Sequence, residues 1–182
     1  MQIRITTEEP DILSRDTLAI GFFGDERPPR GDCGLVDWRL NGLISNEMAR
    51  GHISGNFMET VLISSRSRIP VSKIFLFGLG PLAELTKGKL ALAGYRLSES
   101  MDRILCKDFA FNLPAAGRCH LDVPDITEAM MTGCFNYVAQ DIEKWASFST
   151  SIIAKKSYLE DVIKGLESFQ RNTRDVSVIE IS

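Results

Sequence analysis

The 182-residue sequence lacks the long apolar runs and charge blocks that mark several classes of protein. No stretch approaches the roughly 18 uninterrupted apolar residues that a membrane-spanning helix needs. The first residues, MQIRITTEEPD, lack the charged-then-apolar pattern of a secretion signal. Acidic and basic residues are mixed along a chain of net charge −3, so no basic stripe for a polyanion is visible. We expect a cytoplasmic protein without membrane contact, and nucleic acid is not its expected partner.

Cysteine is scarce and widely spaced. Cys33, Cys106, Cys119 and Cys134 form no CxxC pair. This spacing argues against a zinc ribbon, and a domain of this length does not need a disulfide framework. We therefore predict reduced thiols, with Cys106 and Cys134 packed on helices as small apolar side chains.

The chain does contain enough apolar side chains to fill a core. Hydrophobic residues make up 44% of the sequence, and 182 residues is near the common size of one domain. We find no internal repeat, low-complexity tract or linker, and predict a single domain over residues 1–182. The one clear irregular loop is Pro28–Asp32, where two prolines exclude helix and Gly31 permits a positive φ.

Hydrophobic periodicity predicts an alternation of strands and helices. Apolar runs predict strands near residues 3–5, 17–23, 59–63, 73–77, 108–113, 150–154 and 176–181. Helical spacing predicts helices over about 35–50, 82–106, 125–146 and 157–171, with Asp125 capping the third and a Ser157–Glu160 capping box opening the fourth. Because a crossover helix returns each parallel strand to the same edge, we predict the α/β class: three layers, with helices on both faces of a mixed, mostly parallel sheet.

Four ordered segments carry a family resemblance: DTLAIGFF, RPPRGDCGLVDWRLNG, GHISGNFMETVLI and KIFLFGLG. Together they resemble the amino-terminal domain of the M17 leucyl aminopeptidases. The resemblance implies a macro-domain-like fold and a domain that holds none of the peptidase chemistry. We expect the chain to be this accessory domain without the catalytic metallopeptidase domain.

The catalytic signature of that family has no counterpart in this sequence. M17 peptidases carry an Asn-Thr-Asp-Ala-Glu-Gly-Arg motif with further lysine and acidic ligands for two metals, and no segment here matches it. Two-metal hydrolysis needs several convergent carboxylates, whereas the acidic residues here are scattered along the chain. We expect no catalytic residue, no metal site and no cofactor.

One turn is a candidate ligand site. Gly78, Leu79 and Gly80 follow an apolar strand and precede a helix, so their backbone N–H groups could cradle a phosphate. The third glycine of a dinucleotide fingerprint is missing, and Pro81 removes one donor. A purely structural turn is the favoured interpretation, because a tight strand-to-helix reversal alone requires glycine.

The remaining chemistry-bearing residues are assigned to loops or to packing. The loop around Cys119, His120 and Asp122 is too crowded for a chelate, and no second cluster supplies further ligands. His52 lies at a helix end, where the helix dipole favours a cation. No nearby nucleophile or carboxylate pairing supports a general-base role for it. Trp38 is predicted to be a packed anchor. Asp25, Arg27 and Asp32 cluster around the proline loop and could contact a ligand or a partner, but a solvated loop is the favoured interpretation. A solvated loop is also predicted for Ser64–Ser67.

The resemblance leads to two functions. The first is a non-catalytic interaction or regulatory module that self-associates or docks on another protein chain. In the M17 family this domain helps to assemble the oligomer, and in some members it contributes to nucleic-acid binding. The alternative is a macro-like domain that binds an ADP-ribose-type nucleotide, and a third reading is a longer product cut to this length. We expect self-association first at a helical stripe and the last strand: Leu159, Val162, Leu166 and Phe169, with residues 176–181. The alternative is that this stripe packs only on its own sheet.

Overall fold

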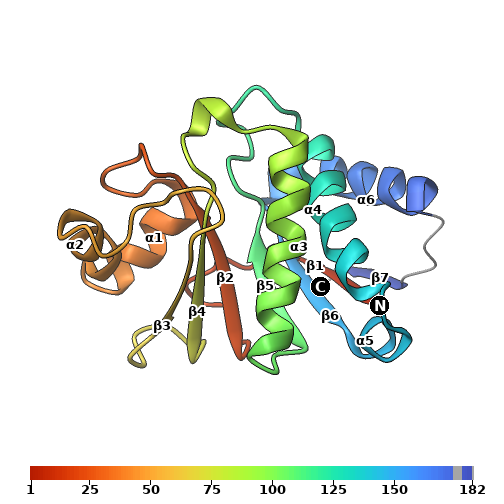
Figure 1. The fold of residues 1–182 in the computed structure, drawn as a ribbon, viewed down its shortest axis with the longest axis horizontal. Coiled ribbons are helices and arrows are strands. Elements are labelled where there is room, and N and C mark those ends of the chain that lie inside the picture. The colour runs from red at the N-terminus through yellow and green to blue at the C-terminus, as the bar shows by residue number, and fades with distance from the viewer. Residues whose placement is uncertain (174–177, 182) are drawn as a thin grey trace.

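A computed structural model describes residues 1–173 and 178–181. The strands form a sheet in the order β3-β4-β2-β5-β6-β1-β7 (Figure 1). They are β1 (Gln2–Thr6), β2 (Thr17–Phe22), β3 (Thr60–Ser64), β4 (Lys73–Gly78), β5 (Asp108–Asn112), β6 (Ser149–Ile153) and β7 (Val178–Ile181). The helices are α1 (Gly31–Arg39), α2 (Leu43–Ala49), α3 (Lys87–Arg103), α4 (Val123–Val138), α5 (Ile142–Ser147) and α6 (Leu159–Thr173), with 3-10 turns η1 (Leu82–Glu84) and η2 (Lys156–Tyr158). Within the described ranges, no helix has the length and apolar character to span a membrane.

The sheet is parallel apart from one edge. All its strand pairings are parallel except that of the edge strand β3 with β4. Each strand lies within two residues of its predicted position, although residues 176 and 177 of the last prediction lie outside the described residues. Because parallel strands end at the same edge, the carboxyl ends of β2, β4, β5 and β6 open onto one rim, at the top of Figure 1.

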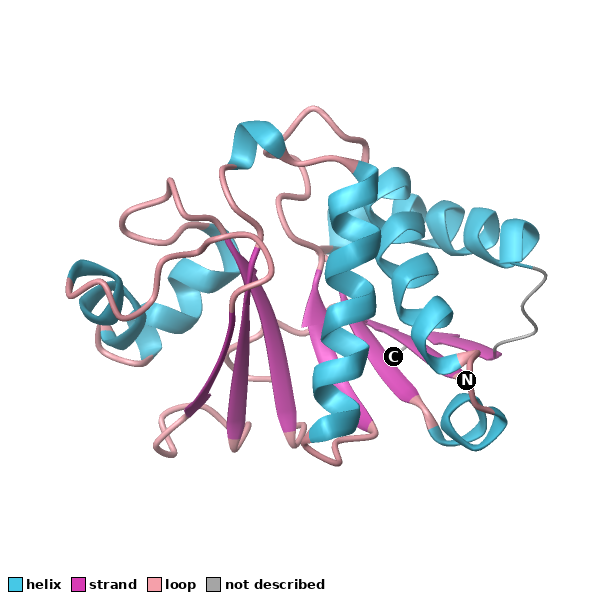
Figure 2. Ribbon diagram, viewed as in Figure 1, coloured by secondary structure: helices cyan, strands magenta, loops and turns pink. Residues whose placement is uncertain are grey.

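Helices cover both faces of the sheet (Figure 2). On one face, Ile20 of β2 shares a buried cluster with Val36 of α1 and Ile44 of α2. On the other face, Phe111 of β5 belongs to a larger buried cluster with Leu97 of α3 and with residues of α4 and α6. All five named side chains are fully buried, so each sheet face is closed by its own helical layer. The predicted three-layer α/β fold with a mixed, mostly parallel sheet is confirmed.

Glycines allow the helices of the larger layer to pack in backbone contact. A Cβ on Gly94 of α3 would lie 2.2 Å from the carbonyl oxygen of Met130 in α4. One on Gly133 of α4 would lie 1.9 Å from the carbonyl oxygen of Ala91, and Gly165 of α6 meets α4 in the same way. Any larger residue would force these helices apart.

Two of the predicted helices are divided in the structure. The helix predicted over 35–50 is α1 and α2, separated by Asn41 at φ 60° and Gly42 at φ 74°. Left-handed residues cannot continue a right-handed helix. The helix predicted over 125–146 is α4 and α5, because the Asp141 side chain accepts the N–H groups of Glu143 and Lys144 and starts a new helix.

The starts of three helices also differ from the prediction. α3 begins at Lys87 rather than at residue 82, because the side chain of Thr86 caps it there. Asp125 does not cap α4, which starts two residues earlier, and its carboxylate instead lies 2.7 Å from Lys87 Nζ. Ser157 lies within η2, so it is not the residue that precedes α6.

The helical stripe expected to serve self-association is buried. Val162, Leu166 and Phe169 of α6 are fully buried in the cluster shared with α4, and Leu159 is partly buried against it. The prediction is wrong for this stripe, because the apolar face of α6 completes the core of its own chain. For the last strand it stays a prediction: β7 is an edge strand with Ile181 59% exposed, and residues 176 and 177 lie outside the described residues.

All four cysteines are free thiols, as predicted. Cys134 is buried in α4, and burial raises the pKa of its thiol to about 11. Cys106 is also buried, but it follows the end of α3 rather than lying on the helix. Cys134 is therefore a protonated packing residue at neutral pH.

Candidate functional site

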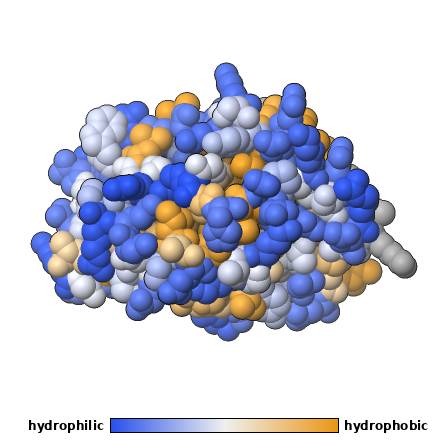
Figure 3. Space-filling model, turned by 90° about the horizontal axis from the view of Figure 1, so that it is seen from above, coloured by the Kyte–Doolittle hydropathy of each residue, from blue (hydrophilic) through white to orange (hydrophobic). Residues whose placement is uncertain are grey.

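A small cavity opens at the carboxyl ends of three neighbouring strands, β2, β5 and β6. Its volume is about 50 Å³. Figure 3 views this end of the molecule, where hydrophilic residues cover most of the surface and hydrophobic ones gather near the middle. In open parallel sheets, ligands bind outside the carboxyl ends of the strands. The polar residues that line the cavity are Arg30, Asp32, Asn112, Arg118, Lys155 and Tyr158.

Asn112 joins three elements at this cavity. It ends β5 and is buried, with 4% of its surface exposed. Its Oδ1 accepts the N–H of Gly21 in β2 at 2.9 Å, and its Nδ2 donates to Asp32 Oδ2 in the first turn of α1 at 3.2 Å. Asn112 was not predicted as a site residue, although a polar residue that ends the apolar run FAF is a signal for a strand-end site.

The cavity has more basic than acidic lining residues. The lining contains three basic residues, Arg30, Arg118 and Lys155, and one carboxylate, that of Asp32. The Arg118 guanidinium forms an ion pair with the nearly buried Glu26, and it lies 3.6 Å from where a Cβ on Gly31 would be. Among the described residues, neither Arg30 nor Lys155 has an ion-pair partner.

The start of α1 adds to this positive charge. No side chain caps α1, whose N-cap residue is Arg30, and its first residue, Gly31, lines the cavity. A helix N-terminus carries partial positive charge, so the arginines here increase the local potential instead of neutralising it. Asp32 in the first turn of α1 and Glu26 beside Arg118 offset part of this charge, so the three basic residues leave one net positive charge at the cavity.

Tyr158, the last residue of η2, also lines the cavity. A Cβ on Gly117 would lie 2.0 Å from the Tyr158 hydroxyl oxygen, so only glycine leaves room for the phenol. Gly117 also has φ +70°, which favours glycine. The cavity of about 50 Å³ is far smaller than the roughly 300–1,000 Å³ of sites that enclose a whole small-molecule ligand.

The predicted phosphate turn lies at the end of β4, where its N–H groups already have partners. Gly78 donates to the carbonyl of Glu59 at 2.8 Å, Leu79 to that of Phe22 at 3.0 Å, and Gly80 to that of Gly55 at 2.9 Å. Gly80 has the predicted type of left-handed backbone, with φ +74°. In this geometry the turn binds neighbouring backbone, and phosphate binding by Gly78, Leu79 and Gly80 stays a prediction.

A carboxylate that the sequence analysis missed organises the adjacent loop. Glu59 accepts the N–H groups of Ser54, Gly55 and Asn56 and also the hydroxyl of Ser54. Burial opposes ionisation of Glu59, but these hydrogen bonds outweigh it and hold its pKa below the ordinary value. The loop in turn packs on the strand end, because a Cβ on Gly78 would lie 2.2 Å from the carbonyl oxygen of Asn56.

His52 does have a carboxylate partner, so that part of the sequence analysis is wrong. Its Nδ1 lies 2.7 Å from Glu47 Oε2 on α2. The contact with His52 lowers the pKa of Glu47, and Arg50 adds to the effect. Both residues line a shallow cavity between α2 and β3, in which the His52 side chain is 65% exposed and that of Glu47 is 26% exposed.

The charged residues of the proline loop bind backbone groups instead of being merely solvated. Asp25 accepts the N–H of Leu82 at 3.0 Å, and Arg27 donates to the carbonyl of Met48 at 3.1 Å. Asp32 alone of this predicted group lines the cavity.

The other predicted loop residues do not converge on a site. Cys119, His120 and Asp122 precede α4, and no group of three or more His, Cys, Asp or Glu residues suited to a metal occurs among the residues described. Ser64 ends β3 and is exposed, whereas Ser65 is buried. These positions add no chemistry to the cavity.

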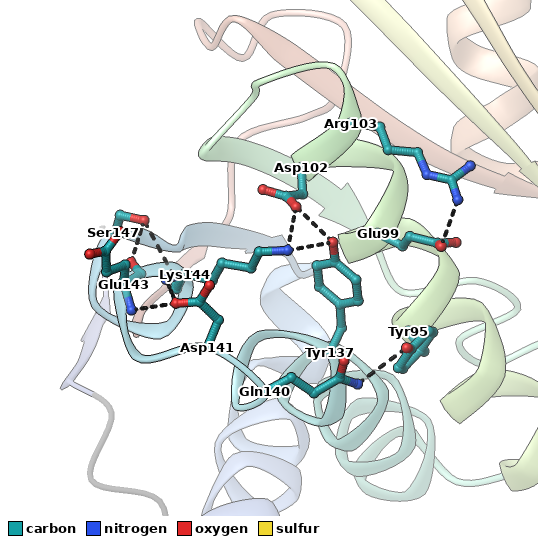
Figure 4. A network of polar contacts seen from close by, with 10 residues as sticks. All are labelled: Tyr95, Glu99, Asp102, Arg103, Tyr137, Gln140, Asp141, Glu143, Lys144 and Ser147. Carbon is teal, nitrogen blue, oxygen red and sulfur yellow. Dashed lines mark hydrogen bonds and ion pairs between the residues drawn. The ribbon is translucent and has the colours of Figure 1, made fainter.

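A second polar cluster joins α3, α4 and α5 (Figure 4). Lys144 Nζ lies 2.8 Å from Asp102 Oδ2, and the Tyr137 hydroxyl donates to the same oxygen at 2.7 Å. Asp102 raises the pKa of Lys144, and burial together with Asp102 raises that of Tyr137. Both groups keep their protons at neutral pH, whereas a general base needs a pKa near the working pH. The cluster is a brace between helices.

Trp38 is on the surface, contrary to the prediction of a packed anchor. Its side chain is 68% exposed, and the Arg39 guanidinium lies over its ring at 4.8 Å. Arg39 also forms an ion pair with Asp11, at 2.7 Å, and Ile12, the next residue in sequence, is 59% exposed. We call Asp11, Ile12, Trp38 and Arg39 the tryptophan patch. The helical stripe of α1 turns Val36 inward, which leaves Trp38 outside.

Comparison with known proteins identifies relatives of this chain by sequence. The family model for the cytosol aminopeptidase family, N-terminal domain, matches residues 19–139. A probable cytosol aminopeptidase of Cyanothece is 26% identical over 141 residues, which cover 78% of this chain and 28% of that protein. One of Geobacter is 27% identical over 137 residues, which cover 73% and 26%. The chain thus spans little more than a quarter of the length of these relatives.

Solved structures show the same fold at low sequence identity. A macrodomain of Oceanobacillus iheyensis with MES bound superposes with a TM-score of 0.73 at 9% identity, over 92% of each chain. The Trypanosoma brucei macrodomain in complex with ADP-ribose gives 0.73 at 12% identity, over 91% of this chain and 69% of that one. The bottromycin maturation enzyme BotP in complex with Mn gives 0.57 at 15% identity, over 85% and 30%. The predicted macro-domain-like fold is confirmed.

Proposed function

The chain belongs to the N-terminal domain family of the cytosol aminopeptidases, and on that premise we propose that it is a non-catalytic cytosolic module that self-associates. The observation that carries this proposal is the tryptophan patch. Tryptophan and arginine are the residues most enriched where alanine substitution costs the most binding energy at protein interfaces. The Trp38 ring is 68% exposed, with the Arg39 guanidinium over it, and this exposed surface is available to a second copy.

The charges of the patch suit contact with an identical surface. Asp11 is 6% exposed and holds Arg39 in place, so the patch carries an internal ion pair instead of an unpartnered charge. Two such patches related by a two-fold axis can meet without like-charge repulsion. The ion pair also fixes the guanidinium over the Trp38 ring before contact, which reduces the entropy lost on association.

Light scattering across a concentration series tests the proposal. We expect the wild-type mass to rise towards that of a dimer, and Trp38→Ala to weaken the dimer by about 2 kcal/mol, or roughly thirtyfold in Kd. Leu105→Ala is the matched control, because Leu105 is 84% exposed and lies outside the patch. Trp38→Ala should leave thermal stability unchanged, since the side chain packs on little.

Two results would count against this function. A monomeric wild-type mass at the highest concentration reached would overturn self-association. A dimer that Leu105→Ala weakens and Trp38→Ala does not would overturn the assignment to the tryptophan patch.

The second candidate function is a macro-like domain that binds an ADP-ribose-type nucleotide. It is favoured by the position of the basic cavity at the carboxyl ends of β2, β5 and β6. Calorimetric titration with ADP-ribose tests it directly. Saturable binding supports this function, and the absence of heat at high nucleotide concentration removes it.

A further inference from the structure

We propose that the basic cavity binds one phosphate group of a small organic phosphate through the side chains of Arg30, Arg118 and Lys155. The proposal does not depend on self-association. It shares a ligand class with the second candidate function, but it assigns the contact to side chains around the cavity and not to the Gly78–Gly80 turn.

Charge selects an anion for this cavity. Three basic residues line the cavity, and two carboxylates offset them in part: Asp32 in the lining and Glu26 beside Arg118. One net positive charge remains next to the start of α1, whose partial positive charge adds to it. Glu26 offsets only Arg118, while Arg30 and Lys155 have no ion-pair partner among the described residues. A phosphate group has three strong acceptor oxygens, so it can bind several of these cationic donors at once, whereas a carboxylate has two.

Size limits what part of the ligand enters. The cavity holds about 50 Å³, and one water occupies about 30 Å³ of the liquid. That space suits one phosphate-sized group and excludes a nucleoside. The organic part of the ligand therefore remains outside, beyond the rim.

Hydrogen-bond donors suited to phosphate line the cavity, whereas the N–H groups of the glycine turn already have acceptors. Guanidinium and ammonium groups give the strongest hydrogen bonds to phosphate oxygens. The hydroxyl of Tyr158 lines the same cavity and has no acceptor within the described residues, so it is a further donor. At the turn, by contrast, the N–H groups of Gly78, Leu79 and Gly80 all donate to backbone carbonyls.

In the experiment, the full chain is titrated at low ionic strength with inorganic phosphate, ribose 5-phosphate, ribose and ADP-ribose. The heat of binding is measured by calorimetry. The test variant is Arg30→Gln with Lys155→Gln, two exposed side chains without ion-pair partners. Arg118 stays, because its loss would leave Glu26 buried and unpaired. The control variant is Arg68→Gln with Lys156→Gln, which removes the same charge from exposed residues outside the cavity.

We expect inorganic phosphate and ribose 5-phosphate to bind saturably, and ribose not to bind. The test variant should bind at least about tenfold more weakly, since charge-assisted contacts dominate phosphate affinity, and the control variant should match the wild type. No saturable binding of either phosphate, or equal weakening in both variants, would overturn the proposal. Tight ADP-ribose binding that the test variant leaves unchanged would also overturn it, while the nucleotide function would stand. Phosphate binding without any gain from ADP-ribose would keep the cavity proposal and remove the nucleotide function.

Discussion

Single carboxylates define the loops at the rim of the sheet. Glu59 binds the N–H groups of Ser54, Gly55 and Asn56, and the Gly55 carbonyl in turn accepts the N–H of Gly80. One side chain thereby orders a loop that packs against the end of β4. This set of hydrogen bonds needs the ionised carboxylate of Glu59, because only that form accepts all of them.

We expect Glu59→Gln to lower the free energy of unfolding by about 1–3 kcal/mol near neutral pH, because it leaves backbone donors poorly satisfied. The pKa of Glu59 is lowered in the folded state, so its contribution is present above the pKa of the unfolded chain and is lost as pH falls through the folded-state pKa. Urea unfolding of wild type and variant should therefore converge in acid. The control is Glu167→Gln, an exposed position on α6. A constant difference at all pH values would contradict the assignment.

At the scale of elements, the close crossing of α3 and α4 holds the larger helical layer together. The crossing depends on glycine at the contact points, since a Cβ at Gly94 would lie 2.2 Å from the backbone of Met130. α3 also contains Gly88, where the nearest neighbour of a Cβ would be the Thr86 side chain at 3.9 Å. The same helix thus offers a crowded glycine and an open one.

We expect Gly94→Ala to destabilise the protein by about 1–3 kcal/mol, because overpacking outweighs the gain of about 1 kcal/mol in helix propensity. Gly88→Ala should be stabilising by about 0.5–1 kcal/mol, since that position has space and a helical backbone. Thermal or urea unfolding of both variants measures the contrast. Equal effects of the two substitutions would show that the crossing does not constrain the fold.

At the scale of the whole molecule, the proposed functions depend on two surfaces, the tryptophan patch on α1 and the basic cavity at the strand ends. The α6 stripe is not available as a third, because it packs on α4. Neither brings together the carboxylates of a two-metal site, and no metal-binding cluster occurs in the part of the chain that the structure describes.

We predict that the purified chain hydrolyses neither leucyl amides nor dipeptides, with or without added manganese or zinc. The physical reason is the scattering of its acidic residues, since two metals need several convergent ligands. A chromogenic leucyl substrate measures this directly. Metal-dependent turnover that copurifies with the chain and disappears when its own acidic residues are replaced would refute the prediction.

The fold class and the strand positions are encoded locally, and they were predicted correctly. Apolar runs such as those of β2 and β5 identify strands because burial on both faces demands consecutive apolar residues. Helix ends were less predictable. The break at Asn41 depends on one left-handed residue, and the start of α5 on one side-chain cap, so hydrophobic periodicity does not report either.

The sequence by itself determined the family, the α/β alternation and the reduced cysteines, because each depends on residue types and on spacing along the chain. Only the tertiary structure decided which side chains meet. Arg30, Arg118 and Lys155 are far apart in sequence and come together because β2, β5 and β6 end at one rim. The exposure of Trp38 was likewise settled by packing, since α1 can turn only one face to the sheet and that face carries Val36. The meeting of these basic residues and the exposure of the Trp38 side chain both depend on contacts between segments distant in sequence. Local sequence patterns do not contain that information.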